Sequence, residues 1–159
     1  MKLRNGDVIN IEKNLKFEIL WPKEEQIQEN ILNNNSIVAK LKYRNFSILF
    51  TGDIEEVAEN QILKEYKNIK VNENTNADTN INTDTNVFLG ATILKVGHHG
   101  SKTSSTQEFI EAVNPKIALI GVGKNNNFGH PNDGVLERLE KIRSKSISYR
   151  SNGRNKYRC

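Results

Sequence analysis

Short runs in which apolar and polar residues alternate fill the first third of the chain, and they predict strands. Residues 15–20 alternate and end at a Trp-Pro pair, which is typical of a half-buried strand with a proline at its exit. Two β-rich runs, residues 37–43 and 46–51, are joined by Arg44 and Asn45. Because Asn tolerates the left-handed conformation of a tight turn, these two runs predict a hairpin.

The rest of the chain combines helical periods with continuous apolar strands. After Gly52 and Asp53 one helical face carries Ile54, Val57, Ala58, Ile62 and Tyr66. Residues 91–96 and 117–122 are apolar enough for buried strands. Between them, Ser105 and Glu108 form a capping box for a helix that ends at residue 113, and residues 135–142 predict a last helix. The pattern predicts an α/β fold.

Composition excludes several classes of protein. Residues 72–86 repeat Asn, Thr and Asp without apolar spacing, so we expect a flexible surface insertion with no chemistry of its own. The mean hydropathy of −0.63 marks a polar chain. No stretch approaches the roughly 18 apolar residues of a membrane helix, and no signal peptide is recognisable. The single cysteine, Cys159, leaves His and carboxylates as the metal ligands.

The net charge of +4 originates at the C-terminal end. Residues 141–158 hold seven Lys or Arg and no acid, whereas residues 1–140 hold 16 bases and 19 acids, a net charge of −3. We therefore expect one domain over residues 1–143 and a basic, disordered tail over residues 144–159. Such tails are more often solvated than specific for phosphate, so the charge alone does not indicate nucleic-acid binding.

Four side chains capable of metal binding or acid–base chemistry share one placement. Each follows an apolar strand, lies beside glycine and precedes a helix: Asp53, His98, His99 and His130. All three histidines of the chain are among them. Loops of this kind gather at one edge of a sheet, where side chains from separate strands converge. We therefore expect these residues to lie within metal-site reach of one another.

Each of them also has a purely structural explanation. Asp53 precedes a predicted helix with Glu56 at the third position, so helix capping and metal binding are equally compatible with it. His98 and His99 suit a polar turn, and adjacent histidines cannot easily both bind one ion. We expect one ligand and one supporting residue. For His130, the local sequence alone favours a loop histidine that stabilises the start of the next helix.

As a set, these motifs resemble the ComEC-type competence family, and the resemblance covers residues 5–143. The segments that carry it are NNSIV at 34–38, FTGD at 50–53, LKVGHHGS at 94–101, NPK at 114–116 and GHP at 129–131. The resemblance implies a metallo-β-lactamase fold, an αββα sandwich, of which this chain holds mainly the C-terminal half. In that family the domain is extracytoplasmic, at the end of a polytopic membrane protein, and is thought to degrade one strand of incoming DNA.

The resemblance also implies roles for individual residues. Asp53 would be the carboxylate that bridges two divalent ions, Zn²⁺ or Mn²⁺, with His98 as imidazole ligand and His99 as the second choice. Asp53, His98 and His130 would form the catalytic set, and Ser101 and His130 would face the phosphate of single-stranded DNA. Two ions about 3.5–4 Å apart need such a shared anionic ligand, and together they generate hydroxide for phosphodiester hydrolysis.

One departure from the family changes the expected activity. The principal ligand loop, of the type His-x-His-x-Asp-His, should precede residues 15–20 and does not occur in this sequence. We therefore expect metal to bind weakly or not at all, and the chain alone to be inactive and, without a signal or membrane segment, cytoplasmic. Two alternatives stay open. One is a non-catalytic remnant or interaction module with a basic tail; the other is a site completed at an interface by the missing N-terminal half or the membrane channel part.

Overall fold

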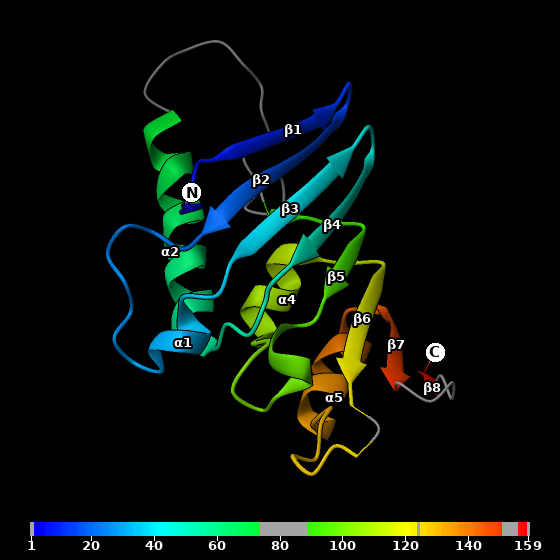
Figure 1. Cartoon of the computed structure of the whole chain (residues 1–159). Coiled ribbons are helices and arrows are strands. Elements are labelled where there is room, and N and C mark those ends of the chain that lie inside the picture. Colours follow the sequence, from blue (N-terminus) through cyan, green and yellow to red (C-terminus); the bar gives the residue numbers. More distant parts are fainter. Residues whose placement is uncertain (1, 74–88, 124, 151–155, 159) are drawn as a thin grey trace.

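The computed structural model describes residues 2–73, 89–123, 125–150 and 156–158 (Figure 1). They form one eight-stranded sheet in the order β1 to β8. The strands are β1 (Val8–Glu12), β2 (Leu15–Trp21), β3 (Val38–Tyr43), β4 (Phe46–Phe50), β5 (Ile93–Lys95), β6 (Ile117–Val122), β7 (Lys145–Arg150) and β8 (Lys156–Arg158). The helices are α1 (Ile31–Asn34), α2 (Glu56–Glu73), α4 (Gln107–Val113) and α5 (Asp133–Lys141), with a short 3₁₀ helix, η1 (Gly97–Gly100).

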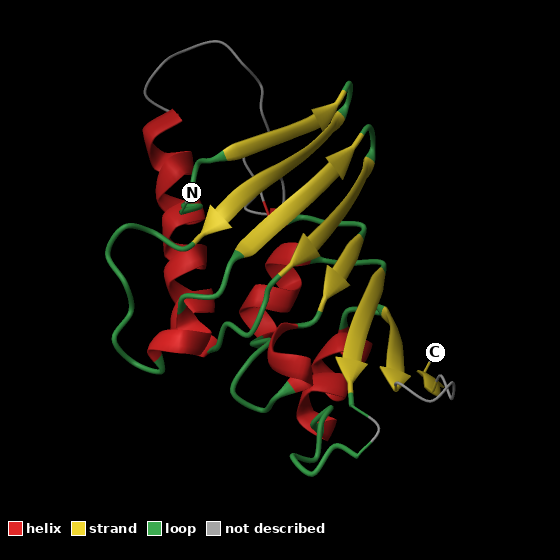
Figure 2. Ribbon diagram, viewed as in Figure 1, coloured by secondary structure: helices red, strands yellow, loops and turns green. Residues whose placement is uncertain are grey.

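The sheet is antiparallel in its first half and mostly parallel in its second. β1 to β4 are antiparallel neighbours, and the predicted hairpin is β3–β4, paired from Tyr43–Phe46 to Ala39–Phe50. Its left-handed turn residue is Arg44, with φ 51°, rather than the predicted Asn45. β4, β5, β6 and β7 run parallel because a helical connection returns the chain across the same face before each new strand (Figure 2).

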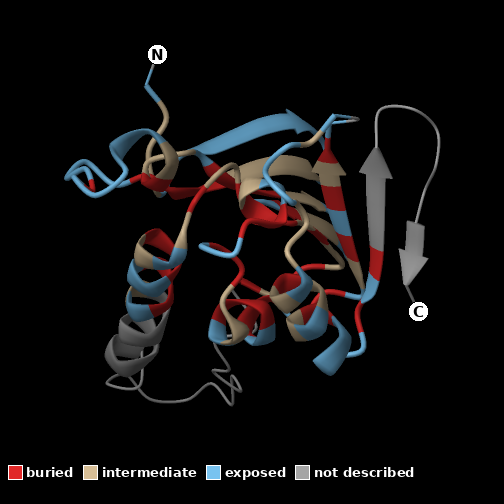
Figure 3. Ribbon diagram, turned by 90° about the horizontal axis from the view of Figure 1, so that it is seen from below, coloured by how far each residue is buried: buried red, intermediate tan, exposed pale blue. Residues whose placement is uncertain are grey.

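The hydrophobic core lies between the sheet and its helices (Figure 3). Leu49, Leu94 and Ile120 point from β4, β5 and β6 into this core, where Phe109 of α4 and Leu139 of α5 are also buried. The opposite face of the sheet is open, and its large apolar side chains Phe46, Phe50 and Leu119 are each 36% exposed or more. The predicted α/β class is confirmed. One sheet with one helical layer corresponds to half of an αββα sandwich, and the metallo-β-lactamase assignment stays a prediction.

Several predicted boundaries differ from the structure. The chain does not leave the sheet at residue 143: β7 pairs with β6 over six residues and β8 pairs with β7, because the edge of β6 offers unpaired backbone groups. The predicted capping box at Ser105 is wrong, since the Thr106 hydroxyl caps α4 by accepting from the Phe109 amide. The predicted insertion at 72–86 begins inside α2 and otherwise lies outside the described residues. Within the described part of the chain, no helix is long and apolar enough to span a membrane.

Candidate functional site

The predicted site residues lie at one edge of the sheet, where the parallel strands β4, β5 and β6 end. Asp53 follows β4, His98 and His99 lie in η1 just after β5, and His130 lies in the loop between β6 and α5. The strands β4, β5 and β6 point the same way (Figure 1). Parallel strands bring their carboxyl ends to the same edge, so three separate loops meet there. The structure therefore brings together the residues that the sequence placed at strand ends.

The turn that carries Asp53 also contacts the loop that carries His98 and His99, which we call the histidine loop. Gly52 has φ 53°, and a Cβ atom at this position would lie 2.7 Å from the Ser36 Cβ, so a side chain does not fit. The Gly52 carbonyl accepts a 3.1 Å hydrogen bond from the His98 amide. The Thr51 hydroxyl donates to the Lys95 carbonyl over 2.7 Å. The Thr-Gly-Asp sequence thus provides close backbone packing as well as a carboxylate.

His99 and Asp53 form what we call the outer pair. The His99 Nε2 lies 3.7 Å from the Asp53 Oδ1, and the two side chains are 51% and 45% exposed. The His99 Nδ1 donates to the Gly121 carbonyl over 2.7 Å, since a carbonyl can only accept. In the neutral ring this bond leaves the lone pair on Nε2, the nitrogen next to Asp53. The outer pair therefore presents one nitrogen and one carboxylate donor to solvent.

His98 and Glu55 form the inner pair. The His98 Nδ1 lies 3.1 Å from the Glu55 Oε1, and the side chains are 25% and 14% exposed. The two atoms are within ion-pair distance, but their orientation is not that of a hydrogen bond. The buried Nδ1 has no hydrogen-bond partner among the described groups. His98 and His99 point apart because both have left-handed backbones, with φ/ψ of 44°/43° and 56°/20°.

The Glu55 carboxylate is held by three further side chains. Asn30 donates to its Oε2 over 2.7 Å, Thr103 to its Oε1 over 3.0 Å, and Asn33 to its Oε1 over 3.5 Å. Burial raises the pKa of Glu55, but these hydrogen bonds, with a smaller contribution from His98, outweigh it and hold the pKa below its usual value. Glu55 therefore stays ionised beside His98.

His130 lies close to His98. The two imidazole rings are 6.0 Å apart, and the exposed Phe128 ring stacks on His130 at 5.9 Å. Burial, and then the nearby His98 and His99, lower the pKa of His130, so it carries a proton less readily than a free histidine. The Gly100 carbonyl accepts a 2.8 Å hydrogen bond from the Asn132 amide. This bond links the histidine loop to the loop that carries His130.

Two predicted residues have surroundings that the sequence did not reveal. Ser101 is buried, and its hydroxyl lies 3.0 Å from the Thr103 hydroxyl, whose proton is donated to Glu55. Ser101 must therefore donate to Thr103, and its hydroxyl faces inward rather than toward solvent. Asp53 lies three residues before the first residue of α2, Glu56, and its carboxylate makes no capping hydrogen bond within the described part of the chain.

The donor set does not by itself fit the two-ion centre that the resemblance implies. Among the described residues, no group of three or more His, Cys, Asp or Glu side chains is arranged to hold a metal ion. The four donors instead divide into the outer and the inner pair, and His98, predicted as the ligand, is turned toward Glu55. The outer pair alone supplies two donors, fewer than the three protein ligands of a typical catalytic zinc site.

Comparison with known proteins places this chain in a family. Over 157 residues, 99% of the chain, the sequence is 34% identical to ComE operon protein 3 of Bacillus subtilis (strain 168). It is also 30% identical over 130 residues to recombination protein 2 of Haemophilus influenzae, and 28% identical over 123 residues to competence protein ComA of Neisseria gonorrhoeae, which are 82% and 77% of the chain. The chain is a homologue of the ComEC-like competence proteins.

The chain spans only a small part of these ComEC-like relatives: 17%, 14% and 15% of their respective lengths. No protein-family model matches it. The family resemblance predicted from the Thr-Gly-Asp and His-His-Gly-Ser motifs is confirmed. The roles of individual residues are not decided by this similarity and depend on the geometry described above.

Two carboxylates at the site were missed by the sequence analysis. Glu55 lies two residues after Asp53, and its position before α2 was the available signal. Glu59, on α2, is 1% exposed and accepts from the Ser105 and Thr106 amides over 2.5 and 2.8 Å. Burial raises its pKa although these amides and Arg138 act in the opposite direction. Glu59 thus fastens the end of the histidine loop to α2.

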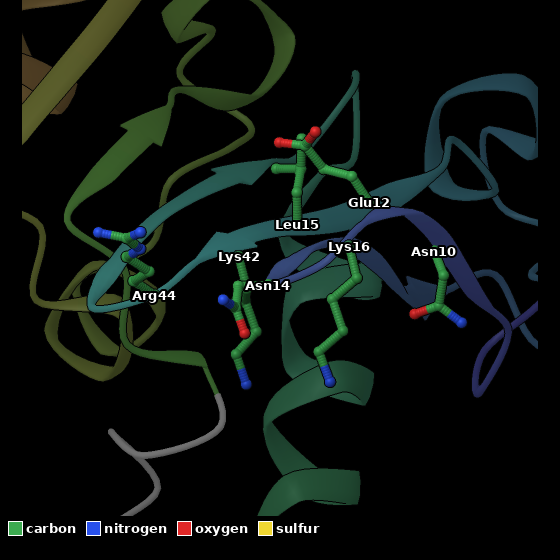
Figure 4. A pocket seen from close by; sticks show the side chains of 7 residues that line it. All are labelled: Asn10, Glu12, Asn14, Leu15, Lys16, Lys42 and Arg44. Atoms are coloured by element: carbon green, nitrogen blue, oxygen red, sulfur yellow. The ribbon is translucent and has the colours of Figure 1, made fainter.

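A separate polar pocket lies at the opposite end of β4, around the tips of the β1–β2 and β3–β4 hairpins (Figure 4). Lys16, Lys42 and Arg44 contribute its positive charge. Both lysines pair with Glu18, at 2.8 and 3.3 Å, and Arg44 lies over the Tyr43 ring. Most of the positive charge of the pocket is therefore already in contact with other groups of the protein. The pocket is also remote from the candidate site.

Proposed function

We propose that this chain supplies part of the site of a metal-dependent DNA phosphodiesterase that acts in DNA uptake. The competence proteins among its relatives support the DNA-uptake assignment. The observation that carries the chemistry is the outer pair: Asp53 Oδ1 and His99 Nε2 lie 3.7 Å apart at the carboxyl edge of parallel strands. Two donor atoms of one coordination sphere are separated by about this distance, given metal–ligand bonds of about 2.0–2.2 Å.

The proposal assigns the outer pair, rather than His98, as the metal-facing donors. His99 is oriented through its Nδ1 by the Gly121 carbonyl, which is how proteins commonly fix a metal-ligating histidine. The remaining ligands of a divalent ion, Zn²⁺ or Mn²⁺, would come from polypeptide outside residues 1–159. The single sheet with one helical layer supports a half metallo-β-lactamase fold, whose completion would bring those ligands to the same edge.

A test in a longer relative addresses this function. In ComE operon protein 3 of Bacillus subtilis, the residue aligned with Asp53 is replaced by Asn, and transformation frequency and release of nucleotides from incoming DNA are measured. Loss of a ligand for the catalytic ion should lower nucleotide release by about 100-fold or more. The matched control replaces the residue aligned with Glu56. Unchanged nucleotide release in the Asn variant would contradict the proposal.

The isolated chain provides the complementary test. Residues 1–159 with labelled single-stranded DNA and Mn²⁺, Zn²⁺ or Mg²⁺ should give no more hydrolysis than the metal alone, because two donors do not acidify bound water sufficiently. Efficient cleavage that disappears in Asp53→Ala and His99→Ala would show that the chain holds a complete site.

A further inference from the structure

We propose that Lys95 is a substrate-binding residue, whose ammonium group contacts a phosphodiester oxygen at the edge of the sheet that carries the outer pair. The inference rests on the proposed function for the identity of that substrate, and it gives the site a cation beside its carboxylates and imidazoles. Ser101, the predicted phosphate contact, turns its hydroxyl toward the protein interior. Lys95 lies at the same edge and has the charge that suits an anion.

The first argument is the position of Lys95 in the sheet, where it is the last residue of β5. The preceding Leu94 points into the core, so the alternation of side chains along a strand directs Lys95 to the open face. Its partners on the neighbouring strands are Phe50 and Leu119, which are exposed apolar side chains of that face. A charged group among apolar neighbours is costly, so its place at this edge favours a role in ligand binding.

The second argument is the direction in which the side chain of Lys95 extends. Its Nζ donates a 2.8 Å hydrogen bond to the Val96 carbonyl, at the point where the chain leaves β5. Its Cε lies against Gly121, where an added Cβ atom would be 3.9 Å away. The carbonyl of the same glycine accepts from the His99 Nδ1. Lys95 and His99 therefore meet at one residue near the end of β6, and the ammonium lies at the edge of the outer pair.

The third argument is that the ammonium of Lys95 has donors available for a ligand. An ammonium has three N–H groups, and among the described residues only the Val96 carbonyl accepts from this one. Burial lowers the pKa of Lys95 and the charge of Asp53 acts in the opposite direction, so Asp53 is within electrostatic reach. No carboxylate in the described part of the chain forms an ion pair with Lys95. Two N–H groups can therefore donate to phosphate oxygens.

The experiment titrates the full chain with the dinucleotide d(TpT), which carries one phosphodiester, and follows amide NMR signals without metal. In wild type the signals of Val96 and Gly121 should shift saturably at millimolar d(TpT), whereas thymidine, which lacks the phosphate, should not shift them. Lys95→Met keeps the length of the side chain but removes the charge, and should weaken binding by about 10-fold. Lys95→Arg should retain part of the affinity. Lys116→Met, which changes an exposed lysine just before β6 at the opposite edge of the sheet, should bind like wild type.

Any of three results overturns the proposal: no saturable shift in wild type, unchanged affinity in Lys95→Met, or an equal loss in Lys116→Met. Urea denaturation reports whether each variant is folded. If Lys95→Met is poorly folded, Lys95→Gln replaces it, because its carboxamide can still donate to the Val96 carbonyl while the charge is absent. The readout needs neither metal nor hydrolysis, so its failure is distinguishable from failure of the nuclease test above.

Discussion

The inner and outer pairs place adjacent histidines in opposite surroundings. In the inner pair Glu55 and His98 are 14% and 25% exposed and 3.1 Å apart, whereas in the outer pair Asp53 and His99 are 45% and 51% exposed and 3.7 Å apart. One carboxylate is held by three side chains, and the other makes no hydrogen bond within the described part of the chain.

The difference shows that adjacent residues of one short loop can have separate roles, one in the scaffold and one in ligand binding. Burial and hydrogen bonds make the inner pair part of the scaffold, so its removal should cost stability. Exposure leaves the outer pair free for a ligand, so its removal should cost binding and little stability. The following predictions test this division, beginning with Glu59, which connects α2 to the end of the histidine loop.

The largest effect on stability is expected for Glu59→Ala. This change leaves the Ser105 and Thr106 amides without their acceptor and removes the carboxyl group near Arg138. Loss of these contacts should lower the free energy of unfolding by about 2–4 kcal/mol. Urea denaturation measures it, with Glu56→Ala as the exposed control. A loss as small as that of the control would mean that α2 does not support the histidine loop.

The next effect separates the two pairs directly. Glu55→Ala should lower the free energy of unfolding by about 1–2 kcal/mol, because Asn30 and Thr103 lose their acceptor. Asp53→Ala should stay within about 0.5 kcal/mol of wild type, as expected for an exposed side chain. Both are measured by urea denaturation at pH 7. Equal losses in the two variants would remove the distinction between a scaffold pair and a free pair.

The pH dependence should follow the inner carboxylate. The pKa of Glu55 is lowered on folding, so its ionised form stabilises the protein above the unfolded pKa of about 4.3, and this contribution is lost as the pH falls through the lower folded pKa. The stability difference between wild type and Glu55→Gln should therefore shrink as the pH falls from 5 toward 3. A difference that grows on acidification would show the opposite sign of the pKa shift.

The smallest effect is expected at the edge of the site. Phe128 stacks on His130 but is 84% exposed, so Phe128→Ser should change the free energy of unfolding by less than about 0.5 kcal/mol. Thermal unfolding measures the change. A larger loss would place the His130 loop in the scaffold together with the inner pair.

Much of the fold could be predicted because the pattern of apolar residues follows burial. The strands at 15–21, 38–43, 46–50 and 117–122 and the convergence of Asp53 with the histidines follow from alternation and from the order of strand, loop and helix. β1 was missed because all five of its residues are exposed, so no buried face marks it. β7 was taken for a tail because its basic residues resemble solvated sequence, although pairing with β6 depends on the backbone.

The arrangement within the site could not be predicted. Two consecutive left-handed residues turn His98 inward and His99 outward, and a left-handed backbone is uncommon for any residue other than glycine. The partner of His98, Glu55, looked like an ordinary acidic residue at the start of a helix. Its role depends on Asn30 and Thr103, which lie 25 and 48 residues away along the chain.

Paramagnetic line broadening by Mn²⁺ in amide NMR spectra of residues 1–159 tests the central claim, that the outer pair faces the metal, most directly, because it detects weak binding. The account predicts that the signals of Gly52, His99 and Gly121 broaden first in wild type and in Glu56→Ala. It predicts that this selectivity is lost in Asp53→Ala and His99→Ala. Broadening that begins elsewhere, or that persists around His98 in both of those variants, would contradict the account.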